Sequence, residues 1–335
     1  MQNGTLTSDL IKIAKEKLAS GEVQSVIGWK KGLFDYDVTP ATFKSAEELE
    51  RDFVYNENCG ANLSKYLVKM TRAIETAKST TRTNNAMAKQ RDPNAVDKPI
   101  PQEKILVFLK PCDTYSFTEL LKENRITRDD VIVVGIPCDG MADTSDPKKL
   151  SEKKLAERCK NCKSKKHITY DELVGEDGDI LESGRFDEVE RLEKMSADER
   201  HAFWKNEFAR CIRCNACRDI CPACTCEKCV FDNNNMYTSH KVAQVSFEES
   251  LYHIIRAWHV AGRCTDCGEC SRVCPEHIPL HLINRKFIKD INEIYGPYTA
   301  GSDMETKPPM LTFTQEDAEP SIVYERSSEK QGEEE

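Results

Sequence analysis

Residues 211–222 read CIRCNACRDICP and residues 264–275 read CTDCGECSRVCP, and these two runs decide how the chain is interpreted. Both follow the pattern Cys-x2-Cys-x2-Cys-x3-Cys-Pro. Three cysteines at this short spacing wrap the chain around one point in a tight turn. The proline then ends the turn, because it lacks an amide donor and fixes the chain direction. The repeat therefore predicts two similar sites built from thiolates.

The pattern is that of bacterial dicluster ferredoxins, in which three cysteines of a run hold one 4Fe–4S cluster and the fourth reaches across to the other. We therefore predict a mainly helical, ferredoxin-like domain over residues 196–300 that binds two such clusters. The predicted ligands are Cys211, Cys214, Cys217 and Cys274 for cluster I, and Cys264, Cys267, Cys270 and Cys221 for cluster II.

Zinc is the main alternative, because paired Cys-x2-Cys units also form structural zinc sites. Such a site needs two pairs and has no use for the third and fourth cysteine of each run. The two complete quartets therefore favour iron–sulfur. A disulfide framework fits less well still, because the chain has 335 residues and carries no secretory signal.

The composition is that of a polar, acidic protein. Charged residues make up 31% of the chain and the net charge is −9, which argues against a nucleic-acid partner. No apolar run approaches the ~18 residues of a membrane span, and the N-terminus has neither signal-peptide character nor a twin-arginine pair. We therefore expect a cytoplasmic protein without a membrane span. Its sixteen cysteines, kept as ligands or reduced thiols, suggest an anaerobic cell.

Residues 105–136 predict a βαβ unit upstream of the cysteine runs. Residues 105–109 and 131–136 are short apolar runs of the buried-strand type, and residues 116–123 between them read as a helix, so a parallel pair of strands is expected. Each strand runs into a Pro-Cys-Asp sequence, at Cys112 and at Cys138. Since α/β sheets place their sites at the carboxyl ends of parallel strands, both thiols should lie at one edge of the sheet.

A further Cys-x2-Cys pair, Cys159 and Cys162, follows this unit. Together with Cys112 and Cys138 it predicts a third 4Fe–4S cluster, in an α/β domain over residues 101–195. The alternatives are that Cys112 and Cys138 are small packed residues, and that the pair binds zinc, binds nothing or forms a redox-active disulfide. The four remaining cysteines could hold a fourth cluster, although thiols that only shape the loop are the simpler interpretation; they are Cys59, Cys224, Cys226 and Cys229.

The rest of the chain is expected to be largely helical. Residues 1–100 are interpreted as an N-terminal α/β region with helices over 8–20, 46–54 and 63–77, a strand over 23–29 paired with 42–44, and a polar linker over 79–101. Further helices are expected before the first run, over 247–261 and over 280–294, and residues 301–335 as an extended acidic tail. The fold class is an α/β domain with a short parallel sheet, a helical dicluster ferredoxin-like domain and an extended C-terminal arm.

Histidines and arginines near the runs allow two interpretations each. His253, His259, His277 and His281 either tune a cluster through hydrogen bonds to sulfur or, as we prefer, lie on the surface or in the packing. Positive side chains beside the runs either offset an anionic cluster and raise its potential or serve as docking contacts; they are Arg213, Arg218, Arg263 and Arg272.

Two Pro-Cys turns, at residues 111–113 and 134–138, precede two cysteine-rich runs, from Arg210 to Cys226 and from Ala261 to Cys270. Taken together, these stretches resemble the beta subunits of deazaflavin-reducing hydrogenases and formate dehydrogenases. The chain is more closely similar to iron–sulfur relatives found beside formate dehydrogenase and heterodisulfide-reductase-type complexes of anaerobes. The resemblance, over about residues 100–300, implies 4Fe–4S clusters and, in the best-known members, a flavin that reduces the deazaflavin. We find no Gly-rich phosphate-binding loop or other stretch to assign to a flavin, and therefore do not predict one.

These inferences predict an electron-transfer subunit of an anaerobic multi-subunit oxidoreductase of formate dehydrogenase, hydrogenase or heterodisulfide-reductase type. Its partners would be the catalytic and electron-transfer subunits of a redox complex. The sequence contains no His-Glu-x2-His and no Walker loop, so no catalytic residue is predicted. Two alternatives stay open, a flavin-containing subunit that reduces a deazaflavin or nicotinamide, and a zinc-stabilised interaction module.

Overall fold

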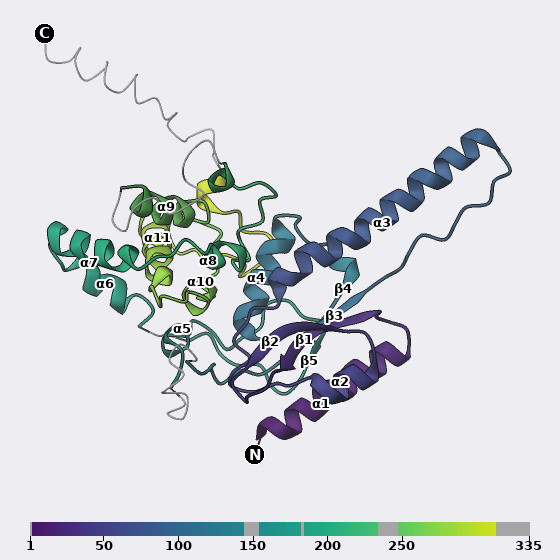
Figure 1. The fold of residues 1–335 in the computed structure, drawn as a ribbon, viewed down its shortest axis with the longest axis horizontal. Coiled ribbons are helices and arrows are strands. Elements are labelled where there is room, and N and C mark those ends of the chain that lie inside the picture. The colour runs from purple at the N-terminus through teal and green to yellow at the C-terminus, as the bar shows by residue number, and fades with distance from the viewer. Residues whose placement is uncertain (1, 144–153, 182–183, 234–246, 313–335) are drawn as a thin grey trace, which may run out of the picture.

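The computed structural model describes residues 2–143, 154–181, 184–233 and 247–312. It has an α/β part built on one sheet and a helical part that contains both cysteine runs (Figure 1). The sheet has five strands in the order β2-β1-β3-β4-β5. The strands are β1 (Ser25–Lys31), β2 (Val38–Phe43), β3 (Ile105–Leu109), β4 (Val131–Gly135) and β5 (Glu172–Leu173).

The sheet is mixed, where the sequence predicted a parallel one. The pairs β1–β3, β3–β4 and β4–β5 are parallel, as expected for the βαβ unit, and β2 pairs antiparallel with β1 at the edge. Because β1 pairs with β3, residues 1–100 and 101–195 share one sheet and one hydrophobic core. The predicted boundary at residue 100 therefore does not separate two sheets.

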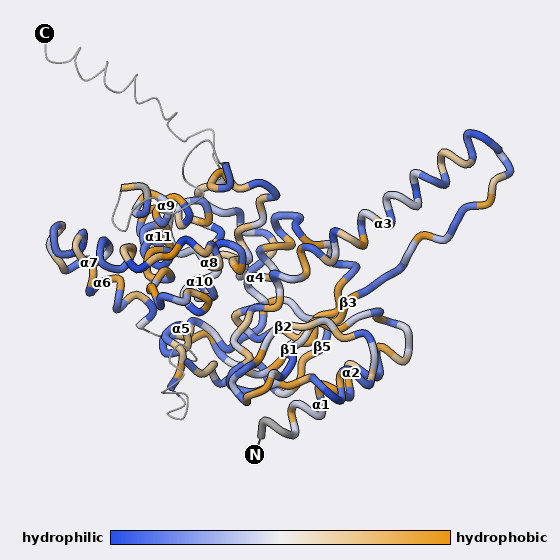
Figure 2. Tube along the Cα trace, viewed as in Figure 1, coloured by the Kyte–Doolittle hydropathy of each residue, from blue (hydrophilic) through white to orange (hydrophobic). Residues whose placement is uncertain are grey.

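Burial accounts for the apolar sequences of the central strands β3 and β4. Every residue of β3 and β4 is buried, as expected for strands covered on both faces, and Figure 2 shows hydrophobic residues concentrated in the sheet. In Figure 1, α1 and α2 lie on one side of the sheet, and α4 and the start of α3 lie on the other. The helices of this half are α1 (Gln2–Ala19), α2 (Ala46–Asp52), α3 (Ser64–Arg91), α4 (Pro111–Lys122) and α5 (Glu157–Lys160), with the 3-10 helix η1 (Arg128–Asp130).

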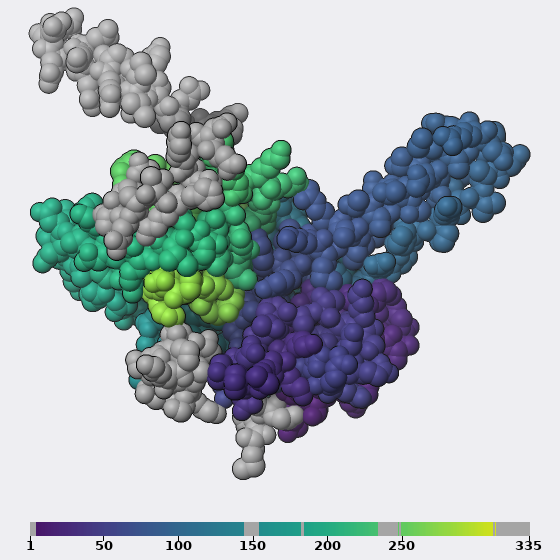
Figure 3. All heavy atoms as spheres, viewed as in Figure 1, coloured from purple at the N-terminus to yellow at the C-terminus, as the bar shows by residue number. Residues whose placement is uncertain are grey.

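The first half of the predicted 79–101 linker is helical instead. Helix α3 continues to Arg91 and projects from the body as an arm with the chain that returns from it (Figures 1 and 3). No residue from 79 to 104 is buried. The Asn85 side chain connects the helix of the arm to the returning chain. It accepts a hydrogen bond from the Lys98 amide at 2.9 Å and donates one to the Lys98 carbonyl at 2.8 Å. The arm lacks an apolar stripe, which is why hydrophobic periodicity did not predict it.

The three helices predicted around the cysteine runs are present as α7 (Ala197–Ala209), α9 (Phe247–Trp258) and α11 (Leu280–Tyr295). The structure adds the helices α6 (Asp187–Glu193), α8 (Ala216–Asp219) and α10 (Glu269–Arg272) and the 3-10 helices η3 (Val230–Asp232) and η5 (Pro309–Leu311). A capping box of Ser196 and Glu199 begins α7. Beyond residue 312 the predicted tail lies outside the described residues.

Within the described residues, no helix combines the length and apolar character that crossing a membrane requires.

Candidate iron–sulfur sites

The two cysteine runs repeat one backbone conformation. Arg213 and Asp266 occupy equivalent positions and have φ values of 57° and 56°, and two residues later Asn215 and Gly268 have φ values of 61° and 69°. A one-turn helix follows in each run, and these two helices, α8 and α10, lie against each other. Left-handed backbone suits Asn, Asp and Gly. It bends the chain back on itself, so the cysteines of a run can face one centre.

One cavity of the helical part is lined by all four cysteines predicted for cluster I, namely Cys211, Cys214, Cys217 and Cys274. The fourth thiol comes from the other run, as the crossed pattern of a dicluster ferredoxin requires. Phe208 from α7 and Leu280 from α11 pack against these cysteines. The amide of Arg213 also donates to the Cys211 sulfur at 3.4 Å, so the left-handed turn aims a backbone N–H at the site.

The four cysteines predicted for cluster II are also neighbours. The Cys221 thiol is among the charges that act on the thiols of Cys264, Cys267 and Cys270. Burial raises the pKa of Cys264 and of Cys270 to about 12, so these groups remain thiols unless a metal holds them as thiolates. On α11, the Asn284 side chain donates to the Cys270 sulfur at 3.5 Å.

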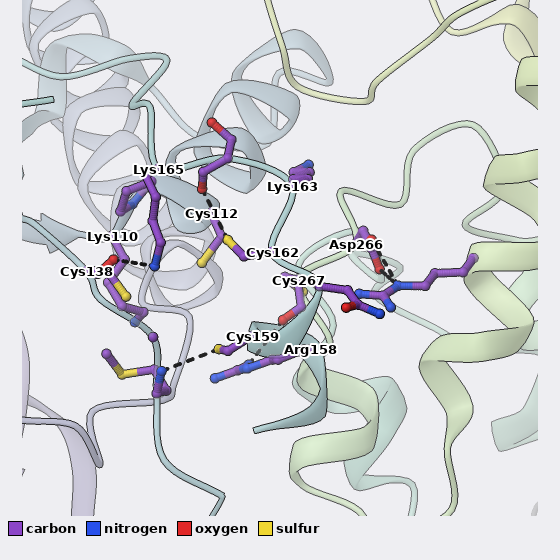
Figure 4. Close-up of a pocket in the computed structure, with 16 residues that line it drawn as sticks. Lys110, Cys112, Cys138, Arg158, Cys159, Cys162, Lys163, Lys165, Asp266 and Cys267 are labelled. Carbon is purple, nitrogen blue, oxygen red and sulfur yellow. Dashed lines mark hydrogen bonds and ion pairs between the residues drawn. The ribbon is translucent and has the colours of Figure 1, made fainter. Parts of the chain in front are cut away.

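The cavity of the predicted third site, the third cavity, lies where the α/β part meets the helical part, and all four cysteines predicted for cluster III line it (Figure 4). Cys112 lies in the first turn of α4, where we had predicted a turn before the helix, and Cys138 follows β4. A thiol that follows β3 and a thiol that follows β4 thus line the same cavity, as expected for the carboxyl ends of parallel strands. Cys159 and Cys162 complete the set, and Cys267 of the second run lines the same cavity.

Positive side chains surround this third cavity. Lys110 is 1% exposed and forms a buried ion pair with Asp113 at 2.8 Å. Arg158 reaches from α5 to Glu269 of the helical part and thereby joins the two parts. Lys163 lines the cavity as well (Figure 4). This charge distribution suits an anionic group.

Cys59 lies apart from the cysteines with which it was grouped for a fourth cluster. Its side chain is buried in the core of the α/β part, where the sulfur accepts from the Asn56 amide at 3.3 Å. Charges that act on it come from Lys110 and Cys138, among others. The charges that act on Cys224 instead include Cys221, Cys226 and Cys229. The structure therefore brings three of the four predicted residues together and does not assemble the set.

Arg256 on α9 was not identified from the sequence. It is 4% exposed, and Nε and one terminal nitrogen have no hydrogen-bond partner among the described residues. The arginines that were identified from the sequence each have a carboxylate partner: Arg213 with Glu249, Arg218 with Asp219 and Asp232, Arg263 with Glu123, and Arg272 with Glu269. A buried cation without a partner is costly. Thiols from both runs act on Arg256, so these residues fit anionic iron–sulfur clusters that would supply the missing counter-charge.

The histidines agree with packing and surface roles. His259 and His277 are exposed. His253 is buried and stacks on Phe208, with ring centroids 4.5 Å apart. His281 is bonded to the Ser271 hydroxyl, and burial lowers its pKa to about 4, so it is neutral.

No three His, Cys, Asp or Glu side chains in the described part of the chain are arranged around a single metal ion.

Comparison with known proteins supports a 4Fe–4S dicluster domain in this chain. A family model described as a 4Fe–4S dicluster domain matches residues 207–278. The F420-dependent formate dehydrogenase subunit beta of Methanocaldococcus jannaschii is 22% identical over 303 residues, which cover 65% of this chain and 79% of the relative. The F420-dependent formate dehydrogenase 1 subunit beta of Methanococcus maripaludis is 21% identical over a 397-residue alignment, which covers 92% of this chain and 94% of the relative. The predicted dicluster domain and the predicted resemblance to beta subunits are thus confirmed.

Proposed function

We propose that this chain, an iron–sulfur electron-transfer subunit of an oxidoreductase, holds three 4Fe–4S clusters in a row and connects a catalytic subunit to a second redox partner. When bound, such clusters supply one-electron transfer. One observation carries the proposal: the cavity lined by Cys112, Cys138, Cys159 and Cys162 is also lined by Cys267 of the dicluster runs. A group held there would adjoin the cluster II ligands.

The proposed ligands are those expected from the sequence. Cys211, Cys214, Cys217 and Cys274 would hold cluster I, Cys264, Cys267, Cys270 and Cys221 would hold cluster II, and Cys112, Cys138, Cys159 and Cys162 would hold cluster III. Support comes from the shared cavities, the crossed fourth thiols and the buried Arg256. We assign no fourth cluster, because Cys59 lies in the core of the α/β part.

The relatives favour a formate-dehydrogenase-type complex. Both are named as beta subunits of formate dehydrogenases, so the partners of this chain would be a formate-oxidising subunit and an electron acceptor. Their names also include F420, which keeps a flavin-containing subunit as the second candidate. A flavin absorbance in the purified chain would favour that candidate.

The test is electron transfer with and without a partner. The anaerobically purified chain should bleach when dithionite is added, because reduced 4Fe–4S clusters absorb less visible light. It should show no turnover with formate or hydrogen alone, and should transfer electrons to a dye when the formate dehydrogenase catalytic subunit of the same organism is added. Turnover by the isolated chain would contradict the proposal, since it would require an active site in this chain.

A further inference from the structure

A guanidinium lies buried on the segment between the two cysteine runs, and none of the described carboxylates forms an ion pair with it. Arg256 is on α9, in the insertion that separates the runs, and is 4% exposed. Its Nε and one terminal nitrogen have no hydrogen-bond partner among the described residues. Buried arginines elsewhere in this part are paired. Arg213, for example, is bonded to the buried Glu249 at 3.1 Å, so that pair is neutral as a unit.

The acidic groups that act on Arg256 are thiols from both proposed clusters and the Tyr252 hydroxyl. Burial acts against its charge, while Cys217 of cluster I and Cys270 and Cys221 of cluster II favour it, and the net pKa lies above its ordinary value. The relation is reciprocal. Burial raises the pKa of Cys217 and of Cys270, and the Arg256 guanidinium opposes that rise at both. The charge of one side chain thus acts on ligands of two sites.

Arginine has the chemistry this position needs. Its planar guanidinium presents five N–H donors in a fixed fork and stays charged, so one side chain can serve sulfur acceptors on two sides. A buried charge is stable only with a counter-charge nearby, and here the nearby candidates are the cysteine sulfurs. Hydrogen bonds and positive charge beside cluster sulfurs raise a reduction potential, because the reduced cluster carries more negative charge.

We infer that Arg256 is a positioning residue shared by clusters I and II, whose buried positive charge offsets the thiolates of both and raises both potentials together. The inference rests on the cluster ligands proposed above. The guanidinium stays protonated in both redox states, so each reduction adds one electron and moves no proton at this residue.

The experiment is a redox titration monitored by EPR on the full chain, purified anaerobically with its clusters. Arg256→Gln removes the charge, Arg256→Lys keeps it, and Arg210→Gln is the control. Arg210 is exposed and paired with Glu207, one residue before Cys211, so solvent and salt screen its charge. At a fixed solution potential, Arg256→Gln should lower the ratio of reduced to oxidised cluster about tenfold at both sites, equivalent to about 59 mV for one electron. Arg256→Lys should stay within about threefold of the wild type and Arg210→Gln within about twofold.

Each outcome decides the inference. Unchanged potentials in fully loaded Arg256→Gln protein would overturn it, as would a shift at one cluster only. If Arg256→Gln fails to retain iron while Arg256→Lys retains it, the charge is required and the inference stands. If both variants lose iron equally, the side chain serves packing and the inference fails. Iron analysis of the wild type separates this from the proposed function, because wild-type protein with fewer than about eight irons per chain would refute the clusters themselves.

Discussion

At the scale of single residues, the cysteines proposed as cluster ligands lie close together in the sequence, whereas the side chains that act on them come from distant segments. Three of the four cysteines that line one cavity of the helical part, Cys211, Cys214 and Cys217, lie within a single run, so their spacing pointed to a shared site. No local sequence pattern identified Asn284, because it lies on another helix and contacts Cys270 only in the folded chain. The same holds for Arg256, whose role follows from its burial without an ion pair among the described residues rather than from a motif.

Asn284→Ala should lower the potential of cluster II. The variant removes the side-chain donor to the Cys270 sulfur, and a net hydrogen bond of about 0.5–1.5 kcal/mol corresponds to roughly 20–60 mV for one electron. EPR titration measures the shift. Asn292→Ala is the matched control on the same helix, since Asn292 bonds the Ile288 and Tyr298 carbonyls instead. Equal potentials in the two variants would show that the Asn284 donor does not act on the cluster.

Cys138→Ala should remove one cluster, and with it about four irons per chain. Cys59→Ala is the matched control, because Cys59 is a buried neighbour of Cys138 that packs in the core. It should keep the full iron content. Iron and acid-labile sulfide analysis of both variants gives the answer. If the Cys59 variant loses iron and the Cys138 variant keeps it, the ligand assignment of the third site is reversed.

At the scale of elements, apolar periodicity predicted the helices that pack against the rest of the protein and missed the helical segment that does not. Helix α11 buries Leu282 and Ile288 and was predicted closely. The outer half of α3 buries nothing, so its thirteen residues from Ser79 to Arg91 had no stripe to reveal them. Figure 2 shows the far end of this arm as mainly hydrophilic.

Replacing residues 82–99 with a short Gly-Ser linker should leave the iron content and the denaturant midpoint of the chain unchanged. The deleted arm contains no buried residue, whereas Lys78 before it forms a buried ion pair with Asp130 and is retained. Iron analysis and anaerobic urea unfolding test this expectation. A loss of clusters, or a midpoint shift equivalent to more than about 1 kcal/mol, would mean that the arm packs on the body.

His281 on α11 should make stability depend on pH. Burial lowers its pKa to about 4 in the folded chain, while an unfolded histidine titrates near about 6.5. Because the unfolded state then binds the proton first, stability is complete above about pH 6.5 and is lost as the pH falls toward 4, by about 2 kcal/mol between pH 7.5 and 5. Urea unfolding of His281→Gln should lack this loss, and the exposed His259→Gln should retain it. A wild-type slope equal to that of His281→Gln would refute the assignment.

At the scale of the whole molecule, the third site depends on how two parts meet. The sequence predicted the βαβ unit and the convergence of Cys112 with Cys138, because parallel strands end at one edge. It did not predict that residues 1–100 would extend the same sheet, since strand partners far apart in sequence leave no local pattern. Nor did it predict that Cys267 would line the third cavity, which follows from contacts across the junction such as Arg158 with Glu269.

Iron and acid-labile sulfide per chain, measured on anaerobically purified wild-type protein, test the central claim most directly. Three clusters in a row predict about twelve irons and twelve sulfides per chain. About eight irons would leave the dicluster domain intact and remove the third site, and with it the proposed connection through the α/β part. Zinc in place of iron, or an iron content that matches a single cluster, would contradict the account as a whole.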